Sequence, residues 1–421
     1  MKRIALTALF LPFPLLAQGP LVPPAGPPVE SMKTLQEIWD HLGVLETQLA
    51  TAQTDLTRTR ADLTLVKADN QLLTGLFSAS AASLSLPWNL TTVDSAGSVG
   101  TFLALAFSPA GQPAISYYKL TGSELRFASY DGNTWNIELP YPFLASETSL
   151  AFNPSGQPAI SAWNVTTGAS GALLLITRAS GTWQTFTVET GGVGKASSLV
   201  FAPDGQPAIA YSDILNKNLK FARYNGSTWA ITTVDNNAND VGSDKNSLAF
   251  GPDGHPAIAY WDRDSLDLKF ARYNGSTWAL STVDSTGSVG VDATLKFGPD
   301  GQPAIAYRDV TNSDLKLARY NDITWTLSTP ESAGNVGRFA SLAFGPDGQP
   351  AIAHYDDAND DLRFTRYNGS SWASAAVDTT GDVGSQCALS FGPDGQPAIS
   401  YYDFTNQNLK FARKGVFKAA P

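Results

Sequence analysis

The sequence predicts an all-β fold, a seven-bladed β-propeller preceded by an α-helical coiled coil, and three observations support this prediction. The phrase F-x-P-x-G-x-P-A-I occurs seven times, at spacings of 45 to 49 residues. A period in the forties, built from short apolar runs and Gly/Pro turns, is typical of propeller blades. A heptad pattern precedes the repeats, and a segment before the first repeat can supply the strand that the last repeat lacks.

The N-terminus has the composition of a secretory signal peptide over residues 1–17. Lys2 and Arg3 are basic, and the apolar run that follows ends at Ala17, too short to span a membrane. We therefore expect a secreted, periplasmic or cell-surface bacterial protein without a membrane span; a retained signal anchor is the alternative. Residues 18–31 are rich in Pro and Gly, which predicts an extended linker.

Residues 32–77 carry apolar or small side chains at alternating steps of three and four, which predicts a left-handed coiled coil. A polar residue at one a position, Asn70, is typical of a device that fixes register, whereas dimer and trimer both stay open. The alternative is one long helix that lies on the propeller. Residues 78–86 are expected to form a hinge. The expected oligomerisation contacts are Leu42, Leu45, Leu49, Leu56, Leu63 and Asn70.

Each repeat is expected to form four strands, and the fourth repeat illustrates the pattern. Its strands are predicted over Ser247–Phe250, Pro256–Tyr260, Leu268–Tyr273 and Trp278–Val283, with a tight Asn-Gly hairpin between the last two. The second strand alternates large and small side chains, which suits blades that stack face to face.

The propeller is predicted over residues 87–414, with residues 415–421 as a tail. The last copy of the third strand, Leu409–Arg413, has no fourth strand after it. We expect Trp88–Val93 to pair with it and close the ring, which removes two open sheet edges.

Composition excludes several classes of function. The net charge is −10 and no basic stripe is visible, so nucleic acid is not an expected partner. The histidines His41, His255 and His354 show neither metal-ligand nor catalytic-triad spacing, so no metal and no cofactor are expected. A sialidase-type enzyme needs several converging arginines, yet only Arg263, Arg308 and Arg338 of the propeller break the repeat. We therefore predict no catalytic residue and leave enzymatic activity open, as the less favoured hypothesis.

The hairpin segment A-R-Y-N-G-S-T-W at Ala271–Trp278 resembles the Asp-box of sialidase-like propellers, S-x-D-x-G-x-T-W. It keeps the Gly, Thr and Trp of that motif but has Tyr273 in place of its Asp and Ala271 in place of its Ser. The layout also resembles that of propeller lectins. The resemblance implies the same topology and turn packing, and propellers of this kind serve as enzymes, lectins and scaffolds.

One position varies within the otherwise fixed repeat, two residues after the Ala or Ser of A-I-[AS]. It is aromatic in five of seven repeats, and Asp follows it in five. An aromatic ring beside an acid, on loops repeated around a ring, would suit sugars, which stack on rings and donate hydrogen bonds to carboxylates. The alternative is that the aromatic side chains seal gaps between blades and Asp caps the next turn. The candidate ligand-binding residues are Tyr118, Trp163, Trp261, Arg308, Tyr355, Tyr402, Asp262, Asp309 and Asp403.

The sequence thus favours a secreted, non-catalytic binding or scaffold propeller, multivalent through a coiled coil, whose partners are itself and a glycan or surface protein. Weakly binding heads gain avidity when they are linked, which suits a binding module. Two alternatives stay open: a sialidase-like or lyase-type enzyme, and a structural protein of an envelope or extracellular layer.

Overall fold

A computed structural model describes residues 40–54, 86–165, 171–236, 241–242 and 245–415. The chain divides into two compact units, Met1–Leu76 and Phe77–Pro421. Among the described residues, no helix is long and apolar enough to cross a bilayer. The predicted signal peptide and linker lie outside the described residues, as does the predicted hinge apart from Leu86.

The first unit contains a helix over residues 40–54, and this finding corrects the coiled-coil prediction. Leu42, Leu45 and Leu49 lie on this helix and are 45%, 52% and 59% exposed, so their apolar stripe is not buried. A heptad pattern specifies a stripe but not the surface that covers it. A coiled coil over residues 32–77 is therefore not supported, and Leu56, Leu63 and Asn70 lie outside the described residues.

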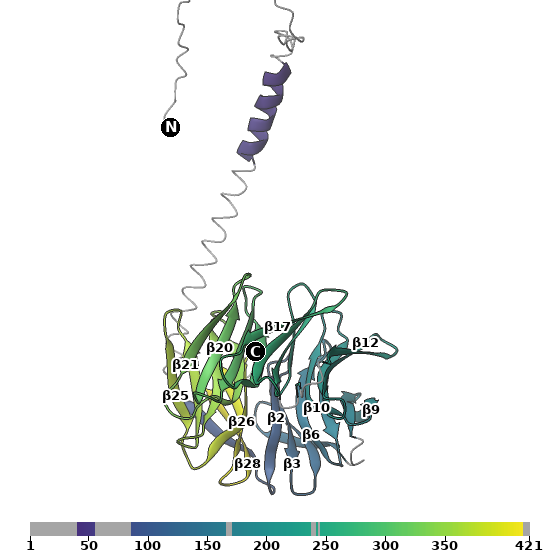
Figure 1. Ribbon diagram of the computed structural model, residues 1–421. Helices are drawn as coiled ribbons and strands as arrows, with labels where there is room; N and C mark the ends of the chain where they lie inside the picture. Colours follow the sequence, from purple (N-terminus) through teal and green to yellow (C-terminus); the bar gives the residue numbers. More distant parts are fainter. Residues whose placement is uncertain (1–39, 55–85, 166–170, 237–240, 243–244, 416–421) are drawn as a thin grey trace, which may run out of the picture. The chain divides into compact units, whose positions relative to one another are not determined.

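The second unit is a propeller of seven four-stranded antiparallel sheets (Figure 1). Strands follow chain order within blades 1–6, and β1 completes blade 7. Blade 1 contains β2 (Val99–Phe107), β3 (Pro113–Lys119), β4 (Glu124–Tyr130) and β5 (Trp135–Tyr141). Blade 2 contains β6 (Ala145–Phe152), β7 (Pro158–Asn164), β8 (Ala172–Ala179) and β9 (Thr182–Thr190). Blade 3 contains β10 (Val193–Phe201), β11 (Pro207–Asp213), β12 (Asn218–Tyr224) and β13 (Trp229–Asp235). Blade 4 contains β14 (Ser247–Phe250), β15 (Pro256–Asp262), β16 (Asp267–Tyr273) and β17 (Trp278–Asp284).

The remaining blades repeat the plan. Blade 5 contains β18 (Val289–Phe297), β19 (Pro303–Asp309), β20 (Asp314–Tyr320) and β21 (Trp325–Glu331). Blade 6 contains β22 (Arg338–Phe344), β23 (Pro350–Asp356), β24 (Asp361–Tyr367) and β25 (Trp372–Asp378). Blade 7 contains β26 (Val383–Phe391), β27 (Pro397–Asp403), β28 (Asn408–Lys414) and β1 (Trp88–Asp94). The predicted seven-bladed all-β architecture is confirmed.

The first strands of the blades form the inside of the ring. Each of β2, β6, β10, β14, β18, β22 and β26 contacts the first strand of both neighbouring blades, and β26 contacts β2. We call these seven the inner strands. Because they close on one another, side chains near their starting ends share one end of the ring.

Ring closure occurs as predicted. Strand β1 pairs antiparallel with β28, with Trp88 opposite Lys414 and Asp94 opposite Leu409. The Trp88 ring packs edge-on against Phe364 of the preceding blade, with ring centroids 5.3 Å apart. An N-terminal strand thus holds the C-terminal blade in the ring.

Blades stack through the alternation of large and small side chains in their second strands. Ile258 and Tyr260 of β15 pack in one core cluster with Ala208 and Ala210 of β11. On the other face of β15, its alanines receive an Ile and a Tyr from β19 in the same way. The face of each second strand that carries large side chains therefore packs against a face of the next blade that carries alanines, which gives the close packing that protein interiors need.

A polar bond reinforces each of several blade junctions. The hydroxyl of Tyr307, on β19 of blade 5, donates to Asp284 Oδ2 at 2.6 Å, across the junction from β17 of blade 4. Lys316 Nζ donates to the same carboxylate oxygen at 2.5 Å. Burial and this carboxylate raise the pKa of Tyr307 far above its ordinary value, so the hydroxyl stays a donor. Tyr117, Tyr260 and Tyr401 make the same bond, to Asp94, Asp235 and Asp378.

Candidate binding site at one end of the ring

The candidate site lies where the inner strands begin and the second strands end. These two ends lie together because the strands are antiparallel: Thr101 pairs with Tyr118, and Arg338 pairs with Tyr355. The second strands end two residues later than predicted, so that β15 runs to Asp262. The candidate ligand positions, expected on loops, are therefore the last residues of strands.

Six inner strands carry a residue with positive φ near this end, where the strand register shifts. Left-handed backbone in residues other than glycine is uncommon, and bulges of this kind re-aim side chains. Lys245 of blade 4 lies at the equivalent position, two residues before β14. We call these seven residues the rim: Phe102, Glu147, Ala196, Lys245, Asp292, Phe339 and Gln386.

The polar rim residues join neighbouring blades. Asp292 Oδ2 accepts a hydrogen bond from the backbone N–H of Phe339 at 2.7 Å. Glu147 accepts one from the N–H of Ala196 at 2.5 Å, and Gln386 accepts one from the N–H of Phe102. These three acceptors satisfy strained backbone, so a structural role accounts for them.

The aromatic rim residues Phe102 and Phe339 differ, because their side chains accept no backbone hydrogen bond from a neighbouring blade. Phe102 is 39% exposed, and its ring centroid lies 6.2 Å from that of Tyr118. Phe339 lies 6.4 Å from Tyr355 in the same manner, and Arg338 stacks over the Phe339 ring at 5.0 Å. Two blades thus present a phenylalanine backed by a tyrosine at the same end of the ring.

The predicted ligand-binding aromatics are mostly covered. Tyr118, Tyr355 and Tyr402 are only 4%, 5% and 6% exposed. Trp163 and Trp261 are partly exposed, but the indole Nε1 of each is buried without a hydrogen-bond partner among the described residues. A ligand could therefore reach these side chains only in part, and their role in binding stays a prediction.

The predicted acids are occupied within their own turns. Asp309 Oδ1 accepts from the N–H of Asn312 at 3.0 Å, and Asp403 Oδ1 from that of Asn406 at 2.9 Å. Asp262 likewise accepts from the N–H of Ser265 at 3.1 Å. All three carboxylates are buried caps of the following turn, the alternative that the sequence left open.

Two of the three unrepeated arginines approach each other. Arg308 Nη2 donates to Asn335 Oδ1 at 2.7 Å, and Asn335 Nδ2 donates to Asp357 Oδ2, also at 2.7 Å. Arg338 Nη1 forms an ion pair with Asp357 Oδ1 at 2.5 Å. Burial and the charge of Arg338 lower the pKa of Arg308. Both guanidinium groups are thus held by protein side chains, and nothing in the described residues brings Arg263 to them.

Tyr355 lies opposite Arg338 in the strand pair, but its surroundings oppose nucleophilic chemistry. Its hydroxyl donates to Asp360 at 2.8 Å and to Asp382 at 3.0 Å. Burial and these two carboxylates raise its pKa well above the ordinary value. An activated nucleophile needs the opposite shift. No group of residues that could hold a metal ion occurs in the described part of the chain.

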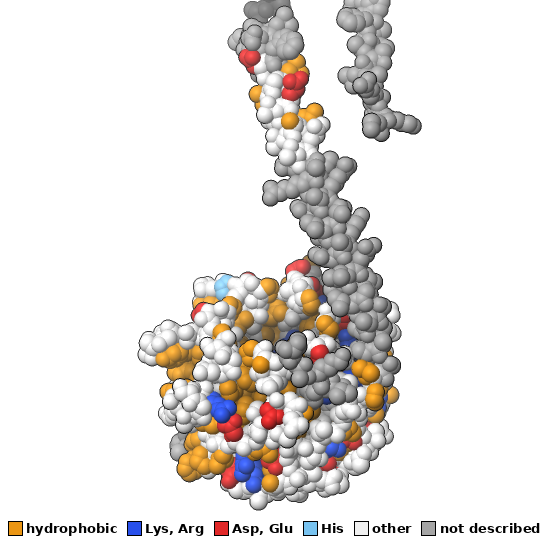
Figure 2. Space-filling view, turned by 180° about the vertical axis from the view of Figure 1, so that it is seen from behind, with side chains coloured by type: hydrophobic (Ala, Val, Ile, Leu, Met, Phe, Trp, Pro, Cys, Tyr) orange, Lys and Arg blue, Asp and Glu red, His pale blue; other side chains and the backbone are white. Residues whose placement is uncertain are grey.

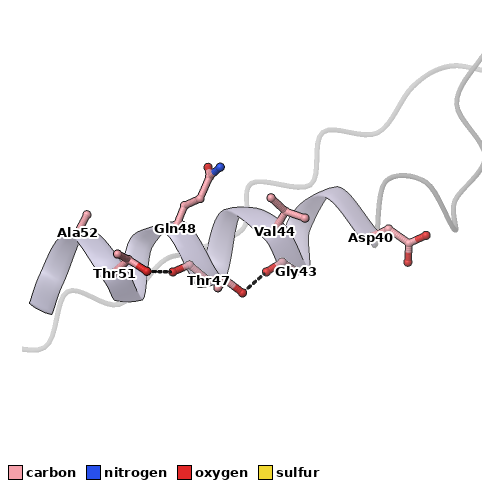
Figure 3. A pocket seen from close by; sticks show the side chains of 7 residues that line it. All are labelled: Asp40, Gly43, Val44, Thr47, Gln48, Thr51 and Ala52. Atoms are coloured by element: carbon pink, nitrogen blue, oxygen red, sulfur yellow. Dashed lines mark hydrogen bonds between the residues drawn. The ribbon is translucent and has the colours of Figure 1, made fainter.

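Two other surfaces do not provide a comparable site. A hollow on the N-terminal helix is lined by residues from that helix, among them Val44, Gln48 and Ala52 (Figure 3). Thr47 and Thr51 there bond back to the helix carbonyls of Gly43 and Thr47. On the propeller face seen in Figure 2, basic and acidic side chains lie side by side rather than in one basic patch.

No protein-family model matches the chain, and no curated protein matches it. Solved structures share the fold. A protein of unknown function from Dyadobacter fermentans is 13% identical, with a TM-score of 0.50 over 78% of this chain and 98% of that one. An ulvan lyase, a polysaccharide lyase bound to -[GlcA(1-4)Rha3S]-, is 13% identical, with a TM-score of 0.54 over 78% and 96%. The NanB sialidase from Streptococcus pneumoniae is 13% identical over 78% and 70%, with a TM-score of 0.45.

The fold and the comparisons together define the class of protein. The chain is a seven-bladed β-propeller, and the Dyadobacter protein and the ulvan lyase share this fold. At such low identity the likeness concerns the fold alone.

The rim was missed by the sequence analysis. A signal for it exists, because two variable residues follow the V-G pair of most repeats, as in Thr101-Phe102 and Arg338-Phe339. The alternating pattern of a strand gives no hint that one of them is a bulge, so their side chains could not be placed from sequence.

Proposed function

We propose that this propeller is a secreted, non-catalytic binding module that contacts a glycan or a surface protein at the rim. One observation supports the proposal above others: the variable aromatic side chains Phe102 and Phe339 lie at one end of the ring and are partly open to solvent, whereas the repeated junction tyrosines are buried between blades. Exposed Phe102 and the Phe339–Tyr355 pair offer the stacking surfaces that sugars use.

The test is a glycan array probed with the full chain and with a double variant, Phe102→Ala/Phe339→Ala. Removal of both rings should weaken binding by about fivefold to 150-fold, since stacking contacts contribute about 0.5–1.5 kcal/mol each. The matched control is Phe186→Ala, which removes an exposed phenylalanine from the outermost strand of blade 2. Equal binding by the double variant and the control would refute a rim site.

Multivalency is the second part of the proposal. The exposed Leu42, Leu45 and Leu49 of the helix over residues 40–54 offer an apolar surface through which two or three chains associate, and linked weak sites gain avidity. A chain without residues 19–86 should keep the same specificity on the array but bind more weakly. An apparent affinity equal to that of the full chain would refute the multivalent arrangement. So would light scattering that shows the same number of chains per particle with and without residues 19–86.

The alternative function, a sialidase-like or lyase-type enzyme, draws support from the proximity of Arg308 and Arg338. This function predicts that the protein releases product from an acidic polysaccharide and that Arg308→Ala abolishes this release. The anchored state of both arginines and the raised pKa of Tyr355 make this the weaker candidate.

A further inference from the structure

Lysines from two neighbouring blades, Lys245 of blade 4 and Lys296 of blade 5, belong to the inside of the ring, and neither is part of the repeat. Lys296 lies on the inner strand β18, directly before the phenylalanine that opens the repeat phrase. The same position in the other blades is small or aliphatic: Ala106, Ala151, Val200, Ala249, Ala343 and Ser390. Lys296 is exposed, although Thr294 and Leu295 just before it are buried.

The second lysine, Lys245, crosses the inside of the ring. It belongs to blade 4, yet its Nζ donates to the backbone oxygen of Ala340 in blade 6 at 2.9 Å. Thr294 Oγ1 of blade 5 donates to the same oxygen at 2.7 Å. The ammonium group of Lys245 therefore lies on the inner side of β18 beside Thr294, two residues before Lys296.

The charges around these lysines are unevenly matched. Burial lowers the pKa of Lys245, and nearby Asp292 partly opposes this effect. The side chain of Lys296 is open to solvent, but partial desolvation by the crowded inside of the ring lowers its pKa, and the like charge of Lys245 lowers that pKa further. In the described part of the chain, Lys296 makes no hydrogen bond or ion pair. Asp292 also accepts the backbone N–H of Phe339, so its carboxylate is shared.

We propose that Lys245 and Lys296 form a binding site for a compact oxyanion, a carboxylate or sulfate group, inside the ring. Such a group would accept hydrogen bonds from both ammonium groups and relieve the repulsion between them. Cationic and apolar ligands do not meet both needs, because only an anion offsets the repulsion between the two ammonium groups. The inference deepens the proposed binding function, on which it rests, because it makes the preferred ligand an acidic glycan.

The alanines of the other blades supply a variant that should fold. Lys296→Ala gives blade 5 the residue that four other blades carry at this position. Without a bound anion the variant should unfold at the same temperature as the parent or a higher one, since it removes a repelled charge. The control, Lys217→Gln, replaces an exposed lysine by the residue that blade 7 has at the equivalent turn position, Gln407.

The experiment titrates the full chain with sodium sulfate and with sodium glucuronate, against sodium chloride at equal ionic strength and against neutral glucose. The parent and Lys217→Gln should show a saturable rise in melting temperature with either oxyanion. Lys296→Ala should require at least about tenfold more of it, as expected for loss of a charge-assisted hydrogen bond. Response to sulfate alone or glucuronate alone would identify which oxyanion the site accepts.

An equal response of the parent and Lys296→Ala would overturn the proposal, because general effects of sulfate on stability act on both alike. The two proposals can fail separately. Binding of neutral glycans through Phe102 and Phe339, with no effect of Lys296→Ala, would sink the oxyanion site alone. A Lys296-dependent response to sulfate without glycan binding on the array would support the site and refute the glycan proposal.

Discussion

Strand β1 should determine whether the ring holds together, and its removal gives the sharpest test of the fold. The change is deletion of residues 87–94, which leaves β28 as an unpaired edge. Three losses can be assigned: the half-buried Trp88 against Phe364, the buried side chain of Val93, and the 2.7 Å hydrogen bond from Tyr117 to Asp94. Typical magnitudes are about 3–5, 1.5–3 and 1.5–3 kcal/mol.

These losses together reach about 6–11 kcal/mol, which is comparable to the entire stability of an ordinary domain. The deleted chain should therefore be unfolded or should melt at a much lower temperature, as followed by circular dichroism and calorimetry. Tyr117→Phe isolates one contribution and should lower the free energy of unfolding by about 1.5–3 kcal/mol. A deletion that melts at the temperature of the parent would refute the reasoning, since closure would then contribute nothing.

Two further predictions concern the blade junctions. Tyr307→Phe should lower the free energy of unfolding by about 1.5–3 kcal/mol in urea denaturation, because it removes a buried hydrogen bond to ionised Asp284. The control is Tyr320→Phe, which changes a hydroxyl with no hydrogen bond in the described residues and should change the free energy of unfolding little. Equal effects of the two variants would count against the junction bond. Burial opposes ionisation of Glu331, but hydrogen bonds from His354 and a serine outweigh it and lower its pKa from 4.5 to about 2. A carboxyl group whose pKa is lower in the folded state stabilises the fold at any pH above its pKa in the unfolded chain. The parent should therefore be more stable than Glu331→Gln by on the order of 3 kcal/mol at neutral pH, and this difference should vanish as pH falls from 4.5 to about 2. A difference in stability that does not depend on pH would contradict this.

The repeat made the fold predictable, whereas the backbone conformation at the start of each inner strand could not be predicted from the sequence. Seven copies of one phrase define seven blades, and a missing last strand points to Trp88 as the closing one. The bulges at Phe102 and Phe339 have no such mark, because a positive φ in a residue other than glycine is imposed by neighbouring blades. The heptads failed for a related reason: they describe the stripe that includes Leu45 but not what covers it.

The candidate site was predictable only as a region. Variation at the ends of the second strands pointed to one end of the ring, where these strands pair with the starts of the inner strands, but not to which side chains there are accessible. Asp309 illustrates the limit: the sequence left a ligand and a turn open for this acid, and only the structure shows that it caps the turn through its bond to Asn312. Lys296 illustrates the reverse, because an unusual residue in an inner strand gains meaning only when the chain brings Lys245 across to it.

Blade 6 shows how to separate structural variation from functional variation in such a repeat. It has His354 where five of the other six blades have the junction tyrosine, and the change is accompanied by Glu331, Thr365 and Arg363 where most blades have Asp, Ala and Lys. These residues contact one another: the imidazole Nε2 lies 3.1 Å from the Glu331 carboxylate and 2.9 Å from Thr365 Oγ1. A substitution that disturbs packing between blades is thus matched by others across the same junction. Lys296 has no such matching change among the described residues, and this absence of compensation is the reason to assign it to a ligand rather than to the fold.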